Sequence, residues 1–562
     1  MSNRSSDHTK LRTNAALTKE AEAEVRRAMG RTLKKLGAVE MEIAGLQDRL
    51  VVLGQRKQDT ERFVEVHEGF LSHIRRLVPE ILQEIFWLCL PVAHNSVLSA
   101  KEAPLLLGRV CSQWRRIAYS TPKLWCSLHI AVPPLTYSRA RAIFKAYEAW
   151  IARSGILPLS ISISDDTGTD RYMDGSRPYF DLITMHTRRW RSIYFQVPFG
   201  DKLDFLADID GDCFPLLEGF YVDRGYFGNL PIMIDHLLSR KDGILSAPLL
   251  RVLSISRNTV GTLDVPIQWN LLTGLDLTYS DLHEVSKLLT LCSNLEMCAL
   301  RLGTSHSPFS NLQSSNDSIP NIVFSKLRTL RISGPNALFI LLNTLATPAL
   351  RHFAYNPISE ARVSSSADLS ASLKVFQSFF QRLNQPLEEL QFETSSSSTR
   401  YLMKFLSLLP GLKRLSLYNP SRLEYSPFND CLLLGFMPSE HKNHCQSCCF
   451  EAEQVDEYEP SFPLSSSPCL CPNLEILNVD FAFLSKHVLF EVLRSRLVDY
   501  DKYNVARLRR FSVSFLTSVE DYERMEEIDD GWVEELGLVV KLGDKPLATA
   551  VETPPSSWQM FP

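Results

Sequence analysis

A group of histidines and cysteines late in the sequence has the side chains best suited to hold a metal ion. Cys445 and Cys448 are separated by two residues, the spacing that lets two thiolates reach one zinc ion. A second cysteine pair lies just before an expected strand at Leu474, where small thiols pack well. We therefore keep structural zinc as an alternative and predict no metal and no cofactor. The group comprises His441, His444, Cys445, Cys448, Cys449, Cys469 and Cys471.

The sequence lacks the motifs that mark common catalytic sites. It has no G-x-S-x-G turn, no phosphate-binding loop, no H-E-x-x-H helix and no G-x-G-x-x-G turn after a strand. Ser, His and Asp residues are scattered, and no spacing brings them together. We predict a protein that acts by binding and is not an enzyme.

Length and charge narrow the choice of partner. The chain has 562 residues, more than one hydrophobic core usually serves, so several domains or a repeat are expected. A formal charge of -4 produces no field that would gather nucleic acid or an anionic membrane. No apolar run approaches the length of a membrane span, and the first residues are polar. We expect a protein partner and a cytoplasmic or nuclear location.

Residues 73–130 predict two helices and a short strand. The first helix should begin at Pro79 and end before Pro91, because proline is favoured at the first helical position and disrupts a helix interior. A second helix should open at Pro104 and end at Ser120, with apolar residues at helical spacing between them. Periodicity alone leaves open a plain helical hairpin inside a larger core.

The order of residues in this stretch resembles the F-box, a module of about fifty residues that docks a Skp-family adaptor of cullin-RING ubiquitin ligases. The segments RRLVPEILQEIF, APLLLGRVCSQWRRIA and STPKLW look like the version found in large fungal families. Two features depart from the pattern: Val78 separates the leucine from the proline, and residues 91–103 lengthen the link between helices. The resemblance implies adaptor contacts from Leu77, Pro79, Glu80, Ile81, Leu82, Ile85, Phe86, Val110, Trp114, Ile117, Leu124 and Trp125.

Residues 18–72 predict a long helix with a coiled-coil seam. Leu36, Ile43 and Leu50 recur every seven residues, and a second apolar set follows three residues behind each. Such a helix could form a homodimer; packing on its own F-box and full solvation remain alternatives. We expect residues 1–17 and the tail 543–562 to be disordered.

Residues 131–542 predict an irregular solenoid. An apolar-x-x-apolar-x-apolar pattern occurs twelve times, and each copy predicts a short strand that must stack on its neighbours to be buried. The copies after Leu217 resemble leucine-rich repeats. We expect an inserted loop at 419–471, and the fold class is α/β. Scattered strands in an ordinary α/β domain are the alternative. The copies begin at Trp125, Trp190, Leu217, Leu250, Leu272, Leu295, Leu327, Leu350, Leu387, Leu412, Leu474 and Leu508.

Alternation along these strands predicts a binding surface. If Leu330 and Ile332 face the core, Arg331 faces the concave side of the solenoid. The same argument nominates Arg301, Arg331, His352, Glu389, Glu393, Arg414, Tyr418, Asp480 and Arg510 as target-binding residues.

The combined expectation is a substrate receptor of a cullin-RING ubiquitin ligase, with a Skp-family adaptor bound at the F-box and an unknown target protein on the solenoid. The alternative is an interaction scaffold of the same architecture that takes no part in ubiquitin transfer.

Overall fold

The computed structural model describes residues 18–71, 73–133, 140–165, 175–197, 200–223, 240–259, 265–279, 282–302, 321–334, 338–357, 366–393, 399–418, 428–437, 469–482, 486–515 and 539–543. The chain divides into two compact units, residues 1–84 and residues 85–562. The predicted disordered ends lie outside the described residues, apart from Gly543.

The first unit contains the predicted long helix. Helix α2 runs without a break over Lys19–Leu71, 53 residues, which corresponds to about 80 Å at 1.5 Å per residue. Thr18 caps its start, since Thr18 Oγ1 accepts a hydrogen bond from the backbone N–H of Ala21 at 3.4 Å. A short 3-10 turn, η1 (His73–Arg76), leads to α3 (Pro79–Leu88), which begins at the predicted proline.

The predicted second helix of the 73–130 stretch is in fact two short helices. They are α4 (Leu107–Val110) and α5 (Ser112–Tyr119), and the expected start at Pro104 is wrong. Cys111 separates them because its backbone is extended, with φ -156° and ψ 172°. The predicted strand also starts later than expected: Trp125 belongs to the 3-10 turn η2 (Pro122–Trp125), and β1 covers Ser127–Ala131.

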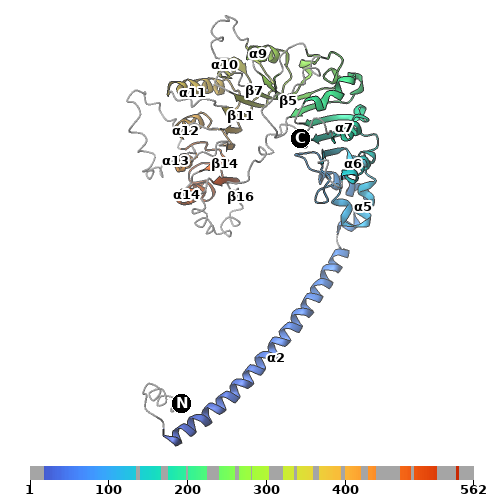
Figure 1. The fold of residues 1–562 in the computed structure, drawn as a ribbon. Helices are drawn as coiled ribbons and strands as arrows, with labels where there is room; N and C mark the ends of the chain where they lie inside the picture. Colours follow the sequence, from blue (N-terminus) through green and yellow to red (C-terminus); the bar gives the residue numbers. More distant parts are fainter. Residues whose placement is uncertain are drawn as a thin grey trace. The chain divides into compact units, whose positions relative to one another are not determined.

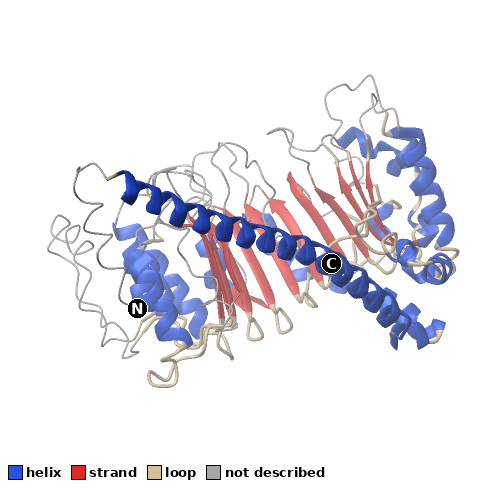
Figure 2. Cartoon of the chain, turned by 90° about the horizontal axis from the view of Figure 1, so that it is seen from below, coloured by secondary structure: helices blue, strands red, loops and turns tan. Residues whose placement is uncertain are grey.

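The second unit is built on one large parallel sheet. Its fourteen described strands follow one another in chain order, and each pair of neighbours is parallel. Figure 2 shows them as a row of arrows with a common direction. After β1 the strands are β2 (Leu159–Ser164), β3 (Trp190–Gln196), β4 (Gly219–Asp223), β5 (Val252–Thr259), β6 (Gly274–Tyr279), β7 (Met297–Leu302), β9 (Thr329–Gly334), β11 (His352–Pro357), β12 (Glu389–Glu393), β13 (Arg414–Tyr418), β14 (Ile476–Ala482), β15 (Arg510–Phe515) and β16 (Val539–Gly543).

Helices return the chain between most of these strands. Consecutive helices from α9 to α14 contact one another, and Figure 1 shows them in a row along one side of the sheet. In the copies beside these helices, the last two pattern residues point from the sheet toward the helices. Phe353, for example, contacts Phe379 of α11, with 5.7 Å between their ring centroids. The helices are α6 (Ala140–Arg153), α7 (Arg177–Thr184), α9 (Leu282–Leu291), α10 (Leu338–Thr344), α11 (Ser366–Gln381), α12 (Thr399–Ser407), α13 (Asp430–Gly435) and α14 (Lys486–Leu497).

The apolar pattern identified in the sequence forms the core. Every pattern residue whose side chain is described is at most 4% exposed. The first residue of each copy precedes its strand, except Trp190, and the other two lie within it with alternate orientation. Of the fourteen strands of this sheet, β2 and β16 have no predicted copy. The mixed α/β class, with a long N-terminal helix and a large parallel sheet, is confirmed.

Backbone hydrogen bonds extend the sheet just before the strands begin. Arg351 donates its backbone N–H to the carbonyl oxygen of Arg328 at 2.9 Å, Glu388 donates to Arg351, and Lys413 donates to Glu388. The side chains of this row carry opposite charges, since Glu388 lies 3.7 Å from both Arg351 and Lys413. The row satisfies backbone groups that would otherwise be left unpaired between strands.

The predicted inserted loop at 419–471 contains a helix. Within the described part of it, α13 begins after Asn429, whose Oδ1 accepts a hydrogen bond from the N–H of Leu432 at 3.3 Å. Leu432 and Leu433 are buried. The helix forms because a capping asparagine precedes two leucines that can reach the core.

Candidate functional site

Five of the twelve residues proposed to contact an adaptor are buried. Leu124 and Trp125 have no exposed surface, and the indole N–H of Trp125 donates to the carbonyl oxygen of Ala118 at 2.8 Å. These side chains hold the short helices together and are not open to a partner. The buried residues are Leu82, Phe86, Ile117, Leu124 and Trp125.

The remaining seven residues reach the surface to different degrees. Leu77, Ile85 and Trp114 are partly buried, while Pro79, Glu80, Ile81 and Val110 are exposed. The ring of Trp114 lies 4.7 Å from that of the buried Phe86, measured between centroids, which fixes its position.

Several exposed apolar side chains near these helices were missed from the sequence. Trp87 and Leu88 lie at the end of α3, and Leu106 lies just before α4. The ammonium group of Lys123 is 3.9 Å from the centre of the Trp87 ring, a cation–π contact that holds the indole at the surface. Helical periodicity could not find Trp87 and Leu88, because neither belongs to the set of apolar residues at helical spacing along this helix.

The sheet has an open face, which we define as the face opposite the row of helices α9–α14. Because neighbouring strands are in register, side chains at equivalent positions lie side by side on this face. One row contains Thr329, His352, Glu389 and Arg414 in successive strands. The next row on the same face contains Asp276, Ala299, Arg331, Ala354, Gln391, Ser416 and Asn478.

The first row is joined by hydrogen bonds. Arg414 Nε donates to Glu389 Oε2 at 2.9 Å, and a terminal nitrogen of Arg414 lies 3.2 Å from His352 Nε2. A guanidinium only donates, so His352 Nε2 accepts and Nδ1–H is left to donate to Thr329 Oγ1, 3.4 Å away. The tautomer of His352 is therefore set by its neighbours.

The proposed exposure of Arg331 is wrong. It is 6% exposed, and burial lowers the pKa of its guanidinium group. Arg301 remains at the surface and pairs with Asp276 at 3.2 Å. Arg510 is exposed, and Asp480 lies in β14 with its side chain outside the described residues.

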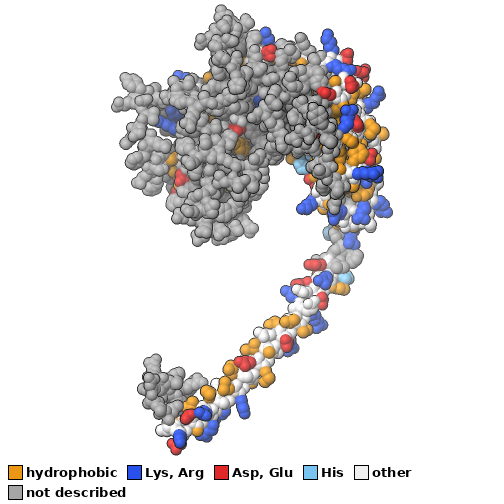
Figure 3. Space-filling model, viewed as in Figure 1, with side chains coloured by type: hydrophobic (Ala, Val, Ile, Leu, Met, Phe, Trp, Pro, Cys, Tyr) orange, Lys and Arg blue, Asp and Glu red, His pale blue; other side chains and the backbone are white. Residues whose placement is uncertain are grey.

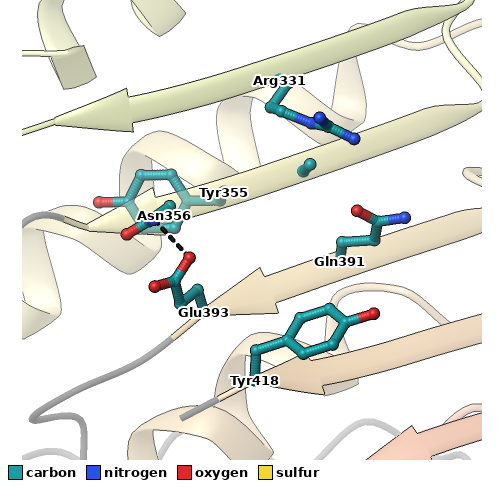
Figure 4. Close-up of a pocket in the computed structure, with 7 residues that line it drawn as sticks. Arg331, Tyr355, Asn356, Gln391, Glu393 and Tyr418 are labelled. Atoms are coloured by element: carbon teal, nitrogen blue, oxygen red, sulfur yellow. Dashed lines mark hydrogen bonds between the residues drawn. The ribbon is translucent and has the colours of Figure 1, made fainter. Parts of the chain in front are cut away.

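A small pocket lies among these rows. It is lined by Arg331, Ala354, Tyr355, Asn356, Gln391, Glu393 and Tyr418, and Figure 4 shows these side chains around one hollow between adjacent strands. The space within it that could hold a water-sized sphere is about 10 Å³, enough for about one water molecule and far below the roughly 300–1,000 Å³ of sites for drug-sized ligands.

Three of the pocket residues, Arg331, Glu393 and Tyr418, were nominated from the sequence, and the others were missed. Asn356 and Gln391 follow the same alternation and could have been found had uncharged amides been considered. Asn356 donates a hydrogen bond to Glu393, drawn as a dashed line in Figure 4. Burial raises the pKa of the Glu393 carboxyl to about 7, an effect that the bond from Asn356 partly opposes.

One serine–histidine arrangement occurs on the first two strands. His129 Nδ1 lies 2.9 Å from Ser162 Oγ, and His129 Nε2 lies 3.4 Å from Ser164 Oγ. Both serines are buried, and the imidazole ring lies between their side chains. These contacts tie β1 to β2.

The metal-binding hypothesis falls largely outside the described residues, which exclude His441, His444, Cys445, Cys448 and Cys449. Cys469 and Cys471 are described, buried and unbridged. No cluster of three metal-ligating side chains occurs within the described ranges. Among the helices that the structure describes, none has the length and apolarity needed to cross a membrane.

Comparison with known proteins adds no relative. Neither the protein-family models nor the curated proteins contain a match to this chain.

Proposed function

We propose that this protein is a substrate receptor of a Skp-cullin-F-box type ubiquitin ligase. Residues 73–130 would be the F-box that docks a Skp-family adaptor, and the strands from β2 onward would be an irregular leucine-rich-repeat solenoid that holds a target protein. The receptor would supply proximity and orientation to the ubiquitin-conjugating enzyme and perform no bond chemistry.

The observation that supports the adaptor proposal is the difference in exposure among the large apolar side chains of the short helices. The large apolar side chains of Leu88 and Val110 are 75% and 56% exposed, whereas those of Phe86 and Trp125 are fully buried. An exposed apolar surface on a well-packed frame is the arrangement expected of a docking site. This pattern of exposure supports the interpretation of residues 73–130 as an F-box.

The repeat proposal draws on the order of the sheet. Strands that follow one another in chain order, each with its apolar pair pointing to the same side, are what stacked repeats require. The row of Thr329, His352, Glu389 and Arg414 is only partly buried and offers donors and acceptors of both charges, a mixture that suits a protein or peptide.

Co-purification with the adaptor and the cullin tests the proposal. In the variant Leu88→Glu with Val110→Glu, the new charges would be desolvated on docking, so we expect more than about a tenfold loss of adaptor. The matched control is Ile156→Glu with Met185→Glu, whose positions are 90% and 73% exposed and lie outside the proposed F-box. The control should retain both partners.

Each outcome has a clear meaning. If the wild type captures neither partner, or if both variants bind equally well, the docking proposal is wrong. If the adaptor is captured without the cullin, the scaffold alternative replaces the ligase role. Circular dichroism must first show that both variants have the wild-type spectrum.

A further inference from the structure

The long helix α2 carries an apolar seam that nothing in its own unit covers. Among the described residues of that unit, α2 is accompanied only by η1 and the start of α3. The six central seam residues are between 49% and 68% exposed, and Figure 3 shows hydrophobic side chains along the length of the helix. These residues are Leu36, Val39, Ile43, Leu46, Leu50 and Leu53.

The seam follows the seven-residue period of a coiled coil, whose positions are labelled a to g. Taking Leu36 as position a puts Met29, Ile43, Leu50 and Val64 at a, and Val25, Val39, Leu46 and Leu53 at d. Polar residues occupy other positions of the seam: Glu22 and Lys57 at a, and Thr32, Thr60 and His67 at d. Gly30, Gly37, Gly45 and Gly54 all fall off the seam. A repeat maintained over this length, with helix-weakening residues kept away from it, indicates a helix that pairs with another helix.

The polar residues within the seam favour a two-stranded coil. Lys57 occupies an a position, where a lysine in a dimer can extend its ammonium group to water along the edge of the interface. In larger bundles the same position is enclosed on more sides. Thr60 follows at d, so the polar step spans one full heptad.

The charges beside the seam distinguish parallel from antiparallel pairing. In a parallel, in-register dimer, a residue at g faces the residue at e five positions later in the partner. Lys35 would then face Glu40 of the second copy, and Arg56 would face Glu61, so both contacts are attractive. Glu61 also pairs with Lys57 of its own helix at 3.6 Å, an exposed contact that can be shared. An antiparallel pair centred on the same seam would also make attractive contacts, Glu42 with Arg49 and Arg26 with Glu61, but it would place Lys35 opposite Arg56. The parallel arrangement is favoured because none of its contacts between g and e positions brings like charges together.

We propose that α2 forms a parallel, in-register coiled coil with a second copy of this chain, which would place two copies of the sheet unit in one assembly. The inference uses only α2 and does not depend on the F-box proposal. Its tests therefore remain informative whether or not an adaptor binds.

Light scattering on the full chain tests the dimer. We expect twice the monomer mass at micromolar concentration for the wild type. The variant Ile43→Asp with Leu50→Asp places charges at two a positions and should be monomeric. The matched control, Met41→Asp with Val52→Asp, changes two equally exposed apolar residues away from the seam and should stay dimeric. A monomeric wild type, or equal masses for the two variants, would overturn the proposal.

Charge exchange tests the orientation. Lys35→Glu alone and Glu40→Lys alone each place like charges opposite each other twice in a homodimer, and each should weaken self-association about tenfold. A mixture of the two variants restores both attractions and should form heterodimers in preference, as measured with two different affinity tags. If each variant self-associates as strongly as the wild type, or if the two variants mix at random, the parallel arrangement is ruled out.

Discussion

Glu393 is a carboxyl group whose environment changes its chemistry. It ends β12 on the open face, within the pocket lined by Tyr418 and Gln391, and burial raises its pKa from 4.5 to about 7. In the folded protein the group is therefore partly protonated near neutral pH. A protonated carboxyl can donate a hydrogen bond to a partner, which an ionised one cannot do.

The raised pKa of Glu393 predicts a pH dependence of stability. Because the folded state holds this proton more tightly than the unfolded state, the contribution is fully present below about pH 4.5 and is lost as pH rises through 7. The loss amounts to at most about 3 kcal/mol. We expect the free energy of unfolding of the wild type, relative to Glu393→Gln, to fall over this window in urea titrations. A constant difference from acid to neutral pH would contradict the assignment.

Arg496 is buried in α14 and is bonded mainly by backbone carbonyl oxygens. It donates to Phe436 at 3.1 Å, Pro472 at 2.9 Å, Leu470 at 3.0 Å and Cys471 at 3.2 Å. Burial lowers the pKa of its guanidinium group. The side chain links α14, the end of α13 and the segment that enters β14.

Replacing Arg496 with methionine should destabilise the protein strongly. The change keeps most of the volume but leaves several buried carbonyl oxygens without donors, so we expect a loss of about 3 kcal/mol in the free energy of unfolding. Arg494→Met is the control, since Arg494 is exposed two residues earlier in the same helix and should change stability by less than about 0.5 kcal/mol. Equal losses in chemical denaturation would show that the carbonyl contacts do not matter.

At the scale of elements, the break between α4 and α5 is the clearest departure from periodicity. The apolar spacing from Leu107 to Ala118 fits one helix, yet Cys111 is extended and serves as the N-cap of α5. Its Sγ accepts a hydrogen bond from the backbone N–H of Trp114 at 3.4 Å. Cysteine is an unusual cap, which explains why the sequence did not reveal the break.

The capping role of Cys111 can be tested with small substitutions. Serine is a stronger acceptor at this position, so Cys111→Ser should raise the free energy of unfolding by about 0.5 kcal/mol, and Cys111→Ala should lower it by a similar amount. Cys89→Ser, at an exposed cysteine just after α3, should have little effect. Thermal unfolding followed by circular dichroism measures all three. The same response from serine and alanine would exclude a cap.

The sequence located most of the other strands but missed β2 and α13, and each result has a physical reason. The repeated pattern located the cores of most strands, because two inward residues per strand repeat at fixed spacing. Strand β2 was missed because its inward pair is Ile161 and Ile163, and the position three residues before Ile161, where each pattern opens, is occupied by the exposed Pro158. Helix α13 was not predicted because it has only 6 residues and lies within a stretch of loop-like composition.

At the scale of the whole molecule, the two units bury their apolar residues in different ways. The sheet unit closes its core internally, because every strand stacks on its neighbours in chain order. Helix α2 has no such neighbour among the described residues of its unit, and its seam stays exposed. The seam of the first unit would be buried by the pairing proposed above, whereas the strands of the second unit bury their apolar residues against one another and their helices.

The sequence by itself determined the period of each region: seven residues along α2 and a strand pattern along the sheet. These follow from local geometry, since a helix or a strand imposes its repeat on whichever residues face the interior. Only the tertiary structure decided which apolar residues of the 73–130 stretch are buried and which are exposed. It also decided that Arg331 is covered and that Asn356, Gln391 and Glu393 share one pocket. Those properties depend on neighbours far away in the chain, and a pattern read along one strand contains no information about the side chains on the next.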